Sequence, residues 1–366
     1  MRPRIKEEHC PVRLGDGWVQ IGGRVLGLGA YLRDPDGSVW ALLELLDGTR
    51  TVGQVVTDLV HLFPDRSAEG VREDIEQLAD MGHLEDADEP ICTELTSRQR
   101  GRYDRGRLLQ RWVDPGSRRS SWDFQVELSR ARVVVVGMGG VGCTAAMALA
   151  MSGVGHLHLV DFDEVELSNL NRQILYTERD LGRRKVDAAV ERLRATNSDI
   201  EVTGESTRIV SPASLEPLAA TCDVLVMCAD HPADIWLWAN RVCVVTRTDW
   251  VFGTYCGPLA NMGVYRPGTG PCYECARATE RDLQARRPPM EVWSGAPTGP
   301  RVVAANAVTA GMVGNQVAWA VLSLITGPSR VRVNHEYGYD LVTLDHAFAF
   351  TPDQPHPECR TCRRIA

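Results

Sequence analysis

Apolar positions in the first 90 residues recur at the spacing of short strands and helices. Residues 18–30 alternate around glycines, which predicts two short strands joined by a glycine turn. Residues 39–48, 49–63 and 67–84 each place their apolar side chains on one helical face, which predicts three helices. We therefore expect a small winged-helix-like α+β domain over residues 1–90.

The pattern changes after residue 130. Short apolar runs at 132–136, 156–160 and 223–227 have the length and β-branched content of buried strands, and helical segments separate them. This alternation predicts an α/β domain with a doubly wound, Rossmann-like sheet over residues 131–366. Residues 91–130 are polar and arginine-rich, which is typical of a solvated linker.

Composition narrows the function classes. A net charge of -8 over 366 residues, together with an acid-rich third helix in the first domain, argues against a nucleic-acid partner. The first residues lack a secretory signal, so we expect a cytoplasmic protein whose eleven cysteines are thiols or metal ligands. Residues 302–329 carry no charge and are long enough to cross a bilayer, but Asn306, Asn315 and Gln316 favour a buried helix and no membrane contact.

A glycine loop follows the first apolar strand of the second domain. Gly137, Gly139 and Gly142 satisfy G-x-G-x-x-G, with Gly140 beside them, and the loop opens a helix. Glycines let the backbone approach a phosphate, while the helix start supplies amide donors. Asp161 then closes the second strand, where it can bind ribose hydroxyls. These features alone fit an NAD dehydrogenase equally well.

The stretch "DFDEVELSNLNRQ" distinguishes a site for ATP from a site for NAD. It contains Asp163, Asn169 and Arg172, and Lys185 follows at the head of the next helix, a set whose cations suit a triphosphate. Asp230 ends another buried strand, at the sheet edge where an acid can hold magnesium on the phosphates. We therefore expect ATP rather than NAD.

Two C-x-x-C pairs lie in the C-terminal part of the chain. Cys272 and Cys275 form "CYEC", and Cys359 and Cys362 form "CRTC". Two such pairs can close a tetrahedral thiolate site for zinc. Four thiolates leave no open coordination position, so this zinc would be structural rather than catalytic.

These motifs together resemble the ThiF/MoeB/HesA family of ubiquitin-activating-enzyme-like adenylyltransferases. The segments that match are "RYDRG", "VVVVGMGGVG", "DFDEVELSNLNRQ", "GRRKVDAA", "CAD", "PCYEC" and "CRTC". The resemblance implies that Asp161 meets the ribose, that Asn169, Arg172 and Lys185 contact phosphates, and that Asp230 binds Mg²⁺. It also implies a split four-cysteine zinc site. Arg105 matches an arginine that reaches into the partner's site, which implies a homodimer with residues 91–130 as linker and dimer arm.

The first domain resembles the PqqD-like precursor-recognition domains of peptide-modification systems. The residues "VWALLELLDGTRTVGQVV" and "VREDIEQLADMGHLE" carry this resemblance. It implies that a leader peptide adds as a strand beside the wing. A generic winged helix for dimer contacts is the alternative. The combination of this domain with an adenylation domain is similar to that of the microcin-maturing MccB and the pantocin enzyme PaaA.

The sequence departs from family members that transfer sulfur or ubiquitin-like proteins. The loop at 276–308 contains no cysteine, which places thioester formation there in doubt. We therefore expect an ATP-dependent adenylyltransferase that activates a carboxylate of a ribosomally made precursor peptide. Alternatives are a leader-binding partner protein without catalysis, a sulfur-carrier activator using another thiol such as Cys256, and, last, a dehydrogenase. The sequence leaves open whether residues 277–300 become ordered only with peptide.

Overall fold

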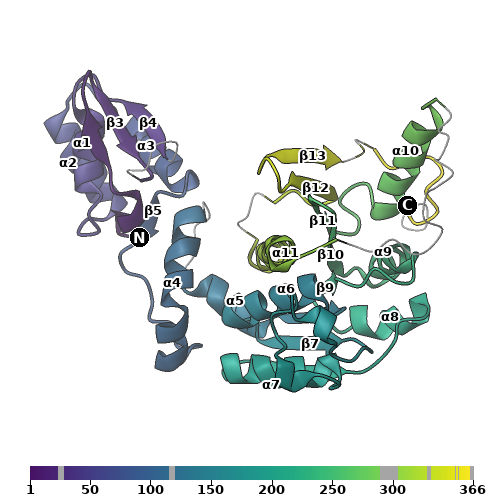
Figure 1. The fold of residues 1–366 in the computed structure, drawn as a ribbon. Helices are drawn as coiled ribbons and strands as arrows, with labels where there is room; N and C mark the ends of the chain where they lie inside the picture. Colours follow the sequence, from purple (N-terminus) through teal and green to yellow (C-terminus); the bar gives the residue numbers. More distant parts are fainter. Residues whose placement is uncertain are drawn as a thin grey trace. The chain divides into compact units, whose positions relative to one another are not determined.

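The computed structural model describes residues 1–23, 29–114, 120–288, 304–327, 331–350, 352 and 354–362, with backbone alone for 347–350. The chain forms two compact units, Met1–Glu127 and Leu128–Ala366 (Figure 1).

The first unit is a small α+β domain. Its strands form two sheets: β1 (Pro3–Ile5) pairs with β5 (Leu84–Asp86), and β2 (Val12–Leu14), β3 (Trp18–Ile21) and β4 (Ala30–Arg33) pair antiparallel in that order. The three predicted helices are present as α1 (Ser38–Leu45), α2 (Val52–Leu62) and α3 (Ala68–Asp80). Part of the predicted glycine turn, residues 24–28, lies outside the described residues.

Local sequence explains where these helices begin and what they bury. The Thr51 side chain accepts from the Gln54 backbone N–H in a capping box, and the Ser67 side chain accepts from Gly70 N–H. The inward faces of the helices pack with Val19 and Ile21 of β3 into one apolar core. The wing and the helices therefore share a single hydrophobic core.

The arginine-rich segment is helical, where its composition predicted a solvated linker. Helix α4 (Ser97–Val113) begins at a Thr96–Gln99 capping box, and α5 (Asp123–Arg130) follows it. The buried Lys6 ammonium donates to the carbonyl oxygens of Arg111 (2.9 Å) and Asp114 (3.0 Å) at the end of α4. A cation there satisfies carbonyls that have no helical partner. This contact between distant segments fixes α4 to the first unit.

An eight-stranded mixed sheet organises the second unit. Its order is β13-β12-β11-β10-β9-β6-β7-β8. Strands β10, β9, β6, β7 and β8 pair in parallel. Strands β10, β11, β12 and β13 pair antiparallel. The bounds are β6 (Arg132–Val136), β7 (His156–Val160), β8 (Glu201–Glu205), β9 (Val224–Met227), β10 (Asp249–Cys256), β11 (Leu259–Tyr265), β12 (His335–Asp340) and β13 (His346–Phe350). The parallel half confirms the predicted doubly wound architecture, whereas the antiparallel extension was not predicted.

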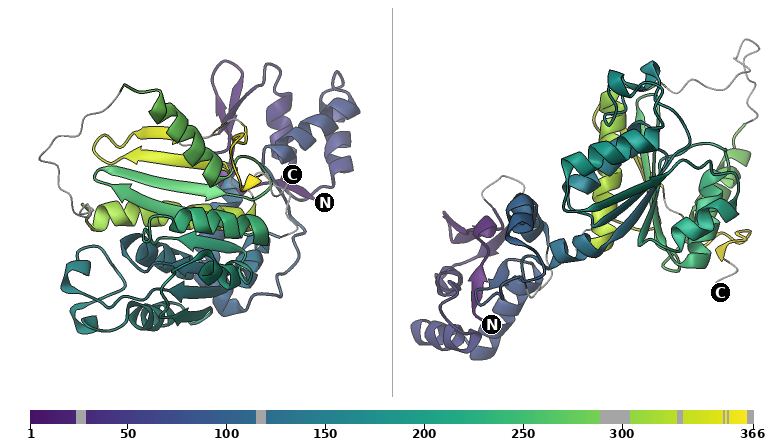
Figure 2. Two further views of the ribbon diagram at one scale, coloured as in Figure 1. Left: turned by 90° about the vertical axis from the view of Figure 1, so that its right-hand side faces the viewer. Right: turned by 90° about the horizontal axis from the view of Figure 1, so that it is seen from below.

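Helices cover both faces of this sheet. They are α6 (Gly140–Met151), α7 (Lys185–Thr196), α8 (Pro212–Ala219), α9 (Ile235–Thr246), α10 (Tyr273–Ala285) and α11 (Ala307–Thr326), with short 3-10 turns at Leu167–Asn169 and Glu178–Asp180. Figures 1 and 2 show α11 and α9 on opposite sides of β10. The loop predicted over residues 276–308 is corrected in part, because α10 continues to Ala285 and α11 begins at Ala307; residues 289–303 lie outside the described part.

Helix α11 is long and apolar enough to cross a membrane by length and composition. In the structure, Val313 and Val317 on this helix are fully buried, and their methyl groups lie against Gly253 of β10. Gly314 approaches Thr144 and Val141 of α6 so closely that an added Cβ would lie 2.5 Å from the Thr144 Cβ. These contacts make α11 a core helix of the second unit.

Candidate functional site

A cavity of about 660 Å³ opens at the carboxyl ends of the parallel strands. It lies where the strand order reverses: β6 and β9 are neighbours in the sheet, and their chains leave in opposite directions. Ligands of doubly wound folds bind at this switch point. Eight of the predicted site residues line the cavity: Gly137, Gly139, Gly140, Asp161, Asp163, Arg172, Lys185 and Asp230.

The glycine loop is shaped by close backbone contacts. Gly137 has φ +95°, and a Cβ there would lie 2.5 Å from Ala229 N, because β9 continues directly beside the loop. A Cβ on Gly142 would lie 1.9 Å from the Gly137 carbonyl oxygen. A Cβ on Gly139, in contrast, would meet nothing within 4 Å. The loop therefore leaves open space above Gly139 that a phosphate group fits.

Two acids at the end of β7 have different roles. The carboxylate of Asp161 accepts from Met138 N–H (2.6 Å) and Asp163 N–H (2.8 Å), so it holds the glycine loop and the following turn together. The Lys185 ammonium donates to Asp163 (3.0 Å), and the Lys185 side chain is only 7% exposed. A buried cation with one exposed carboxylate partner has donors left for a second anion.

The remaining predicted residues are distributed unevenly around the cavity. Arg172 is half-buried, and its guanidinium donates to Ser168 O and to the Asn171 side chain. Asn169 is buried but does not line the cavity: its side-chain oxygen accepts from Glu166 N–H and closes a turn. Asp230 is exposed, and it is 2.8 Å from the Nδ1 atom of His231. Asn169 thus shapes the loop that carries Arg172.

Arg105 lies exposed on α4, in the first unit. Its role in a partner's site stays a prediction.

The cavity wall also includes residues that were not singled out from sequence, among them Phe162, Gln173, Arg208 and His231. Gln173 is 3% exposed, and its side-chain oxygen has no hydrogen-bond partner among the described residues. Because Gln173 directly follows Arg172 in the sequence, it could have been predicted as a site residue. Arg208 follows β8 in a loop without a motif, so only the folded sheet brings it to the cavity.

The two C-x-x-C pairs meet in one buried cluster. Sulfur atoms lie 3.9 Å apart for Cys272 and Cys275, 3.6 Å for Cys272 and Cys359, and 3.5 Å for Cys275 and Cys362. A tetrahedron with Zn–S bonds of about 2.3 Å has edges of about 3.8 Å. The four thiols therefore fit a zinc ion, and Asn240 donates to Cys272 Sγ (3.5 Å), a contact that would orient this ligand.

Thiols elsewhere in the second unit are mostly unreactive. Burial raises the pKa of Cys143 to about 12 and also raises the pKa of Cys228, which lines the cavity. Such thiols are poor nucleophiles at neutral pH. Cys256 is exposed at the end of β10 and is not part of the cavity wall.

Comparison with known proteins agrees with this geometry. The ThiF family matches residues 103–361, and the chain belongs to this family. The chain is 38% identical over 183 residues to "Adenylyltransferase and sulfurtransferase MOCS3" of Culex quinquefasciatus; this match covers 50% of the chain and 40% of the relative. The chain thus spans less than half the length of that relative.

Solved structures match over nearly the whole chain. E. coli MccB with ATP has a TM-score of 0.74 at 22% identity, covering 98% of this chain and 99% of that one. The microcin C7 biosynthetic enzyme MccB with N-formylated MccA has a TM-score of 0.73 at 21% identity, with the same coverage. PaaA has a TM-score of 0.66 at 24% identity, covering 93% and 97%. The predicted resemblance to these proteins is confirmed for the fold.

Proposed function

We propose that the protein is an ATP-dependent adenylyltransferase that activates a carboxylate of a ribosomally made precursor peptide. The observation that carries the proposal is the cavity at the switch point, because it joins a glycine cradle, a ribose-type acid and two cations in one place. A site with this charge distribution suits a triphosphate better than a nicotinamide dinucleotide.

The chemistry follows from charge. A carboxylate oxygen of the peptide attacks the α-phosphorus of ATP, the bond to the bridging oxygen breaks, and pyrophosphate leaves. Lys185 and Arg172 hold the phosphates in line and neutralise the charge that develops on their oxygens. Arg105 of the partner subunit would add a third cation in a homodimer. Magnesium held by Asp230 would neutralise the departing pyrophosphate. The carboxylate is already ionised at neutral pH, so no general base is required.

Recognition of the peptide is assigned to the first unit. Strand β4 is an edge of the three-stranded sheet, so its outer backbone groups are available for a further strand. MccB, which shares the fold over almost the whole chain, was solved in complex with MccA. We infer that the leader of the precursor adds beside β4. A fluorescent leader peptide should bind the protein, and N-methylation of alternate leader residues should abolish binding; unchanged binding would refute strand addition.

Pyrophosphate exchange tests the reaction. With Mg²⁺, ATP and a candidate precursor from the genomic neighbourhood, the protein should exchange labelled pyrophosphate into ATP. Lys185→Gln should lower exchange by about 100-fold, since it removes a cation from the transition state. Arg192→Ala, at an exposed position on α7, is the control and should leave exchange unchanged. Leader binding without any exchange would favour the alternative of a non-catalytic partner protein.

The homodimer has its own test. Each proposed site takes Lys185 from one subunit and Arg105 from the other, so Arg105→Ala and Lys185→Gln remove different halves of the site. Mixing the two inactive variants should restore about a quarter of the activity, because half of the dimers are mixed and each has one intact site. Failure to restore activity in verified mixed dimers would contradict the contribution of Arg105 in trans.

A sulfur-carrier activator is the second candidate. It is favoured by the match to an adenylyltransferase and sulfurtransferase and by the exposed thiol of Cys256. This function predicts a covalent intermediate with a carrier that ends in Gly-Gly, detectable by mass spectrometry and lost in Cys256→Ser. The peptide reading predicts that Cys256→Ser is fully active. Cytoplasmic location stays a prediction from sequence.

A further inference from the structure

An arginine lies over the face of an aromatic ring at the wall of the cavity. Phe162 follows Asp161 at the end of β7, and Arg208 lies in the loop after β8; both line the cavity. The guanidinium carbon of Arg208 is 3.6 Å from the centre of the Phe162 ring. This is van der Waals contact distance between carbon atoms. The guanidinium therefore contacts the face of the ring directly.

The pair is exposed rather than part of the protein core. Phe162 is 41% exposed, and Arg208 is exposed as well. No carboxylate in the described part of the chain pairs with Arg208, so the ring is the contact that orients its guanidinium. Because Arg208 is exposed and its guanidinium contacts Phe162 on one side, the side away from the ring can meet a ligand. A stacked arginine is weakly hydrated and accepts a second planar group at little cost.

The order of the strands indicates which planar group this is. Along the sheet edge, the glycine loop follows β6, Asp161 follows β7, and Arg208 follows β8, and these strands are adjacent in that order. A nucleotide that places its phosphates at the glycine loop and its ribose at Asp161 must direct its base toward Phe162 and Arg208. Phosphate, ribose and base then follow the same order as the strands.

We propose that Phe162 and Arg208 form a base clamp, in which the Arg208 guanidinium lies between the Phe162 ring and the purine base of the bound nucleotide. This inference rests on the proposed nucleotide function and assigns Arg208 to the base rather than to the phosphates. Stacking of this kind does not depend on hydrogen bonds to particular base atoms. The clamp therefore adds affinity for a purine without distinguishing adenine from guanine.

Binding of two probes separates base from phosphate contacts. Isothermal titration of the full chain with Mg²⁺ and either ATP or inorganic tripolyphosphate should show that Arg208→Ala weakens ATP by about 10-fold. Tripolyphosphate, which has no base, should bind the variant within about twofold of the unaltered protein. Arg208→Lys should behave like Arg208→Ala, because an ammonium keeps the charge but lacks the plane.

Control variants complete the design. Lys185→Gln should weaken both probes, and Arg192→Ala should weaken neither; Phe162→Ala should weaken ATP alone. Equal weakening of both probes by Arg208→Ala, or full retention of ATP affinity, would overturn the clamp. Absence of ATP binding by the unaltered protein would overturn the proposed function and the clamp together, whereas normal ATP binding by folded Arg208→Ala overturns the clamp alone. Thermal unfolding confirms that each variant is folded.

Discussion

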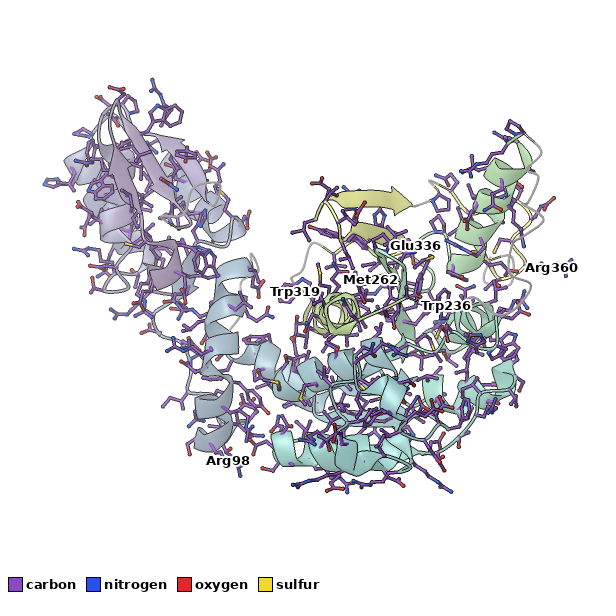
Figure 3. All side chains as sticks on the ribbon, viewed as in Figure 1. Arg98, Trp236, Met262, Trp319, Glu336 and Arg360 are labelled. Atoms are coloured by element: carbon purple, nitrogen blue, oxygen red, sulfur yellow. The ribbon has the colours of Figure 1, made fainter. Side chains whose placement is uncertain are left out.

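A buried ion pair connects helix α10, whose N-cap and first turn carry Cys272 and Cys275, to the antiparallel half of the sheet. Arg277 of α10 donates to both oxygens of Glu336 on β12 (2.7 and 2.6 Å), and the Tyr265 hydroxyl donates to the same carboxylate (2.7 Å). Glu336 is labelled in Figure 3. Its side chain is 2% exposed, while the Arg277 side chain is 29% exposed and also pairs with Glu280. Burial raises the pKa of Glu336, and Arg277 opposes that shift.

The two partners should therefore respond differently to removal. Breaking a buried pair by deleting one partner costs about 3–5 kcal/mol. Arg277→Met leaves a carboxylate almost without solvent, so we expect a loss in the upper half of this range, about 4 kcal/mol. In Glu336→Gln, Arg277 still pairs with Glu280 and remains partly in contact with solvent. We therefore expect a smaller loss of stability, about 2 kcal/mol. These losses correspond to melting temperatures lower by roughly 10 °C and 5 °C.

The loss of stability caused by Arg277→Met should also depend on pH. Without Arg277, the folded-state pKa of Glu336 rises further above its unfolded value, so the cost of Arg277→Met grows as pH increases above about 4.5. Calorimetry at pH 5 and pH 8 measures this directly. The double variant has neither the carboxylate nor the guanidinium, so no buried charge is left unpaired. Its loss in free energy of unfolding should therefore be smaller than the sum of the two single losses. Equal losses in both single variants, or additivity in the double variant, would refute the reasoning.

Three further outcomes test other parts of the structure. Cys275→Ser should remove zinc from a protein that otherwise holds about one ion per chain by elemental analysis, and Cys10→Ser should not. Burial and the neighbouring His9 lower the pKa of His83 to about 4. The free energy of unfolding of the first unit should therefore fall by about 3 kcal/mol as the pH drops from 6.5 to 4. Denaturant unfolding followed by tryptophan fluorescence measures this loss, and a flat pH profile would contradict it. Gly142→Ala should destabilise the fold by about 2 kcal/mol or more, whereas Gly139→Ala should leave stability unchanged and weaken ATP binding. Equal melting temperatures for the two glycine variants would argue against the close contact at Gly142.

Local sequence determined those parts of the protein whose signals are short-range. The glycine loop could be recognised because strand, loop and helix are contiguous, and the close contact between Gly142 and Gly137 spans only five positions. The caps at Thr51 and Ser67 and the apolar faces of α2 and α3 are likewise local. The two C-x-x-C pairs indicated a metal site because a tetrahedral ion needs four thiols, wherever the chain brings them together.

Only the tertiary structure decided which distant residues share the cavity and which segments belong together. Arg208 and His231 carry no motif, and the order of the strands brings them to the same cavity as the glycine loop. Helix α4 appeared to be a linker because its arginines are hydrophilic, yet the buried Lys6 binds the carbonyls at its end. The physical reason is common to these cases: contacts between segments far apart in the chain depend on sheet order and helix docking, which periodicity and spacing do not encode.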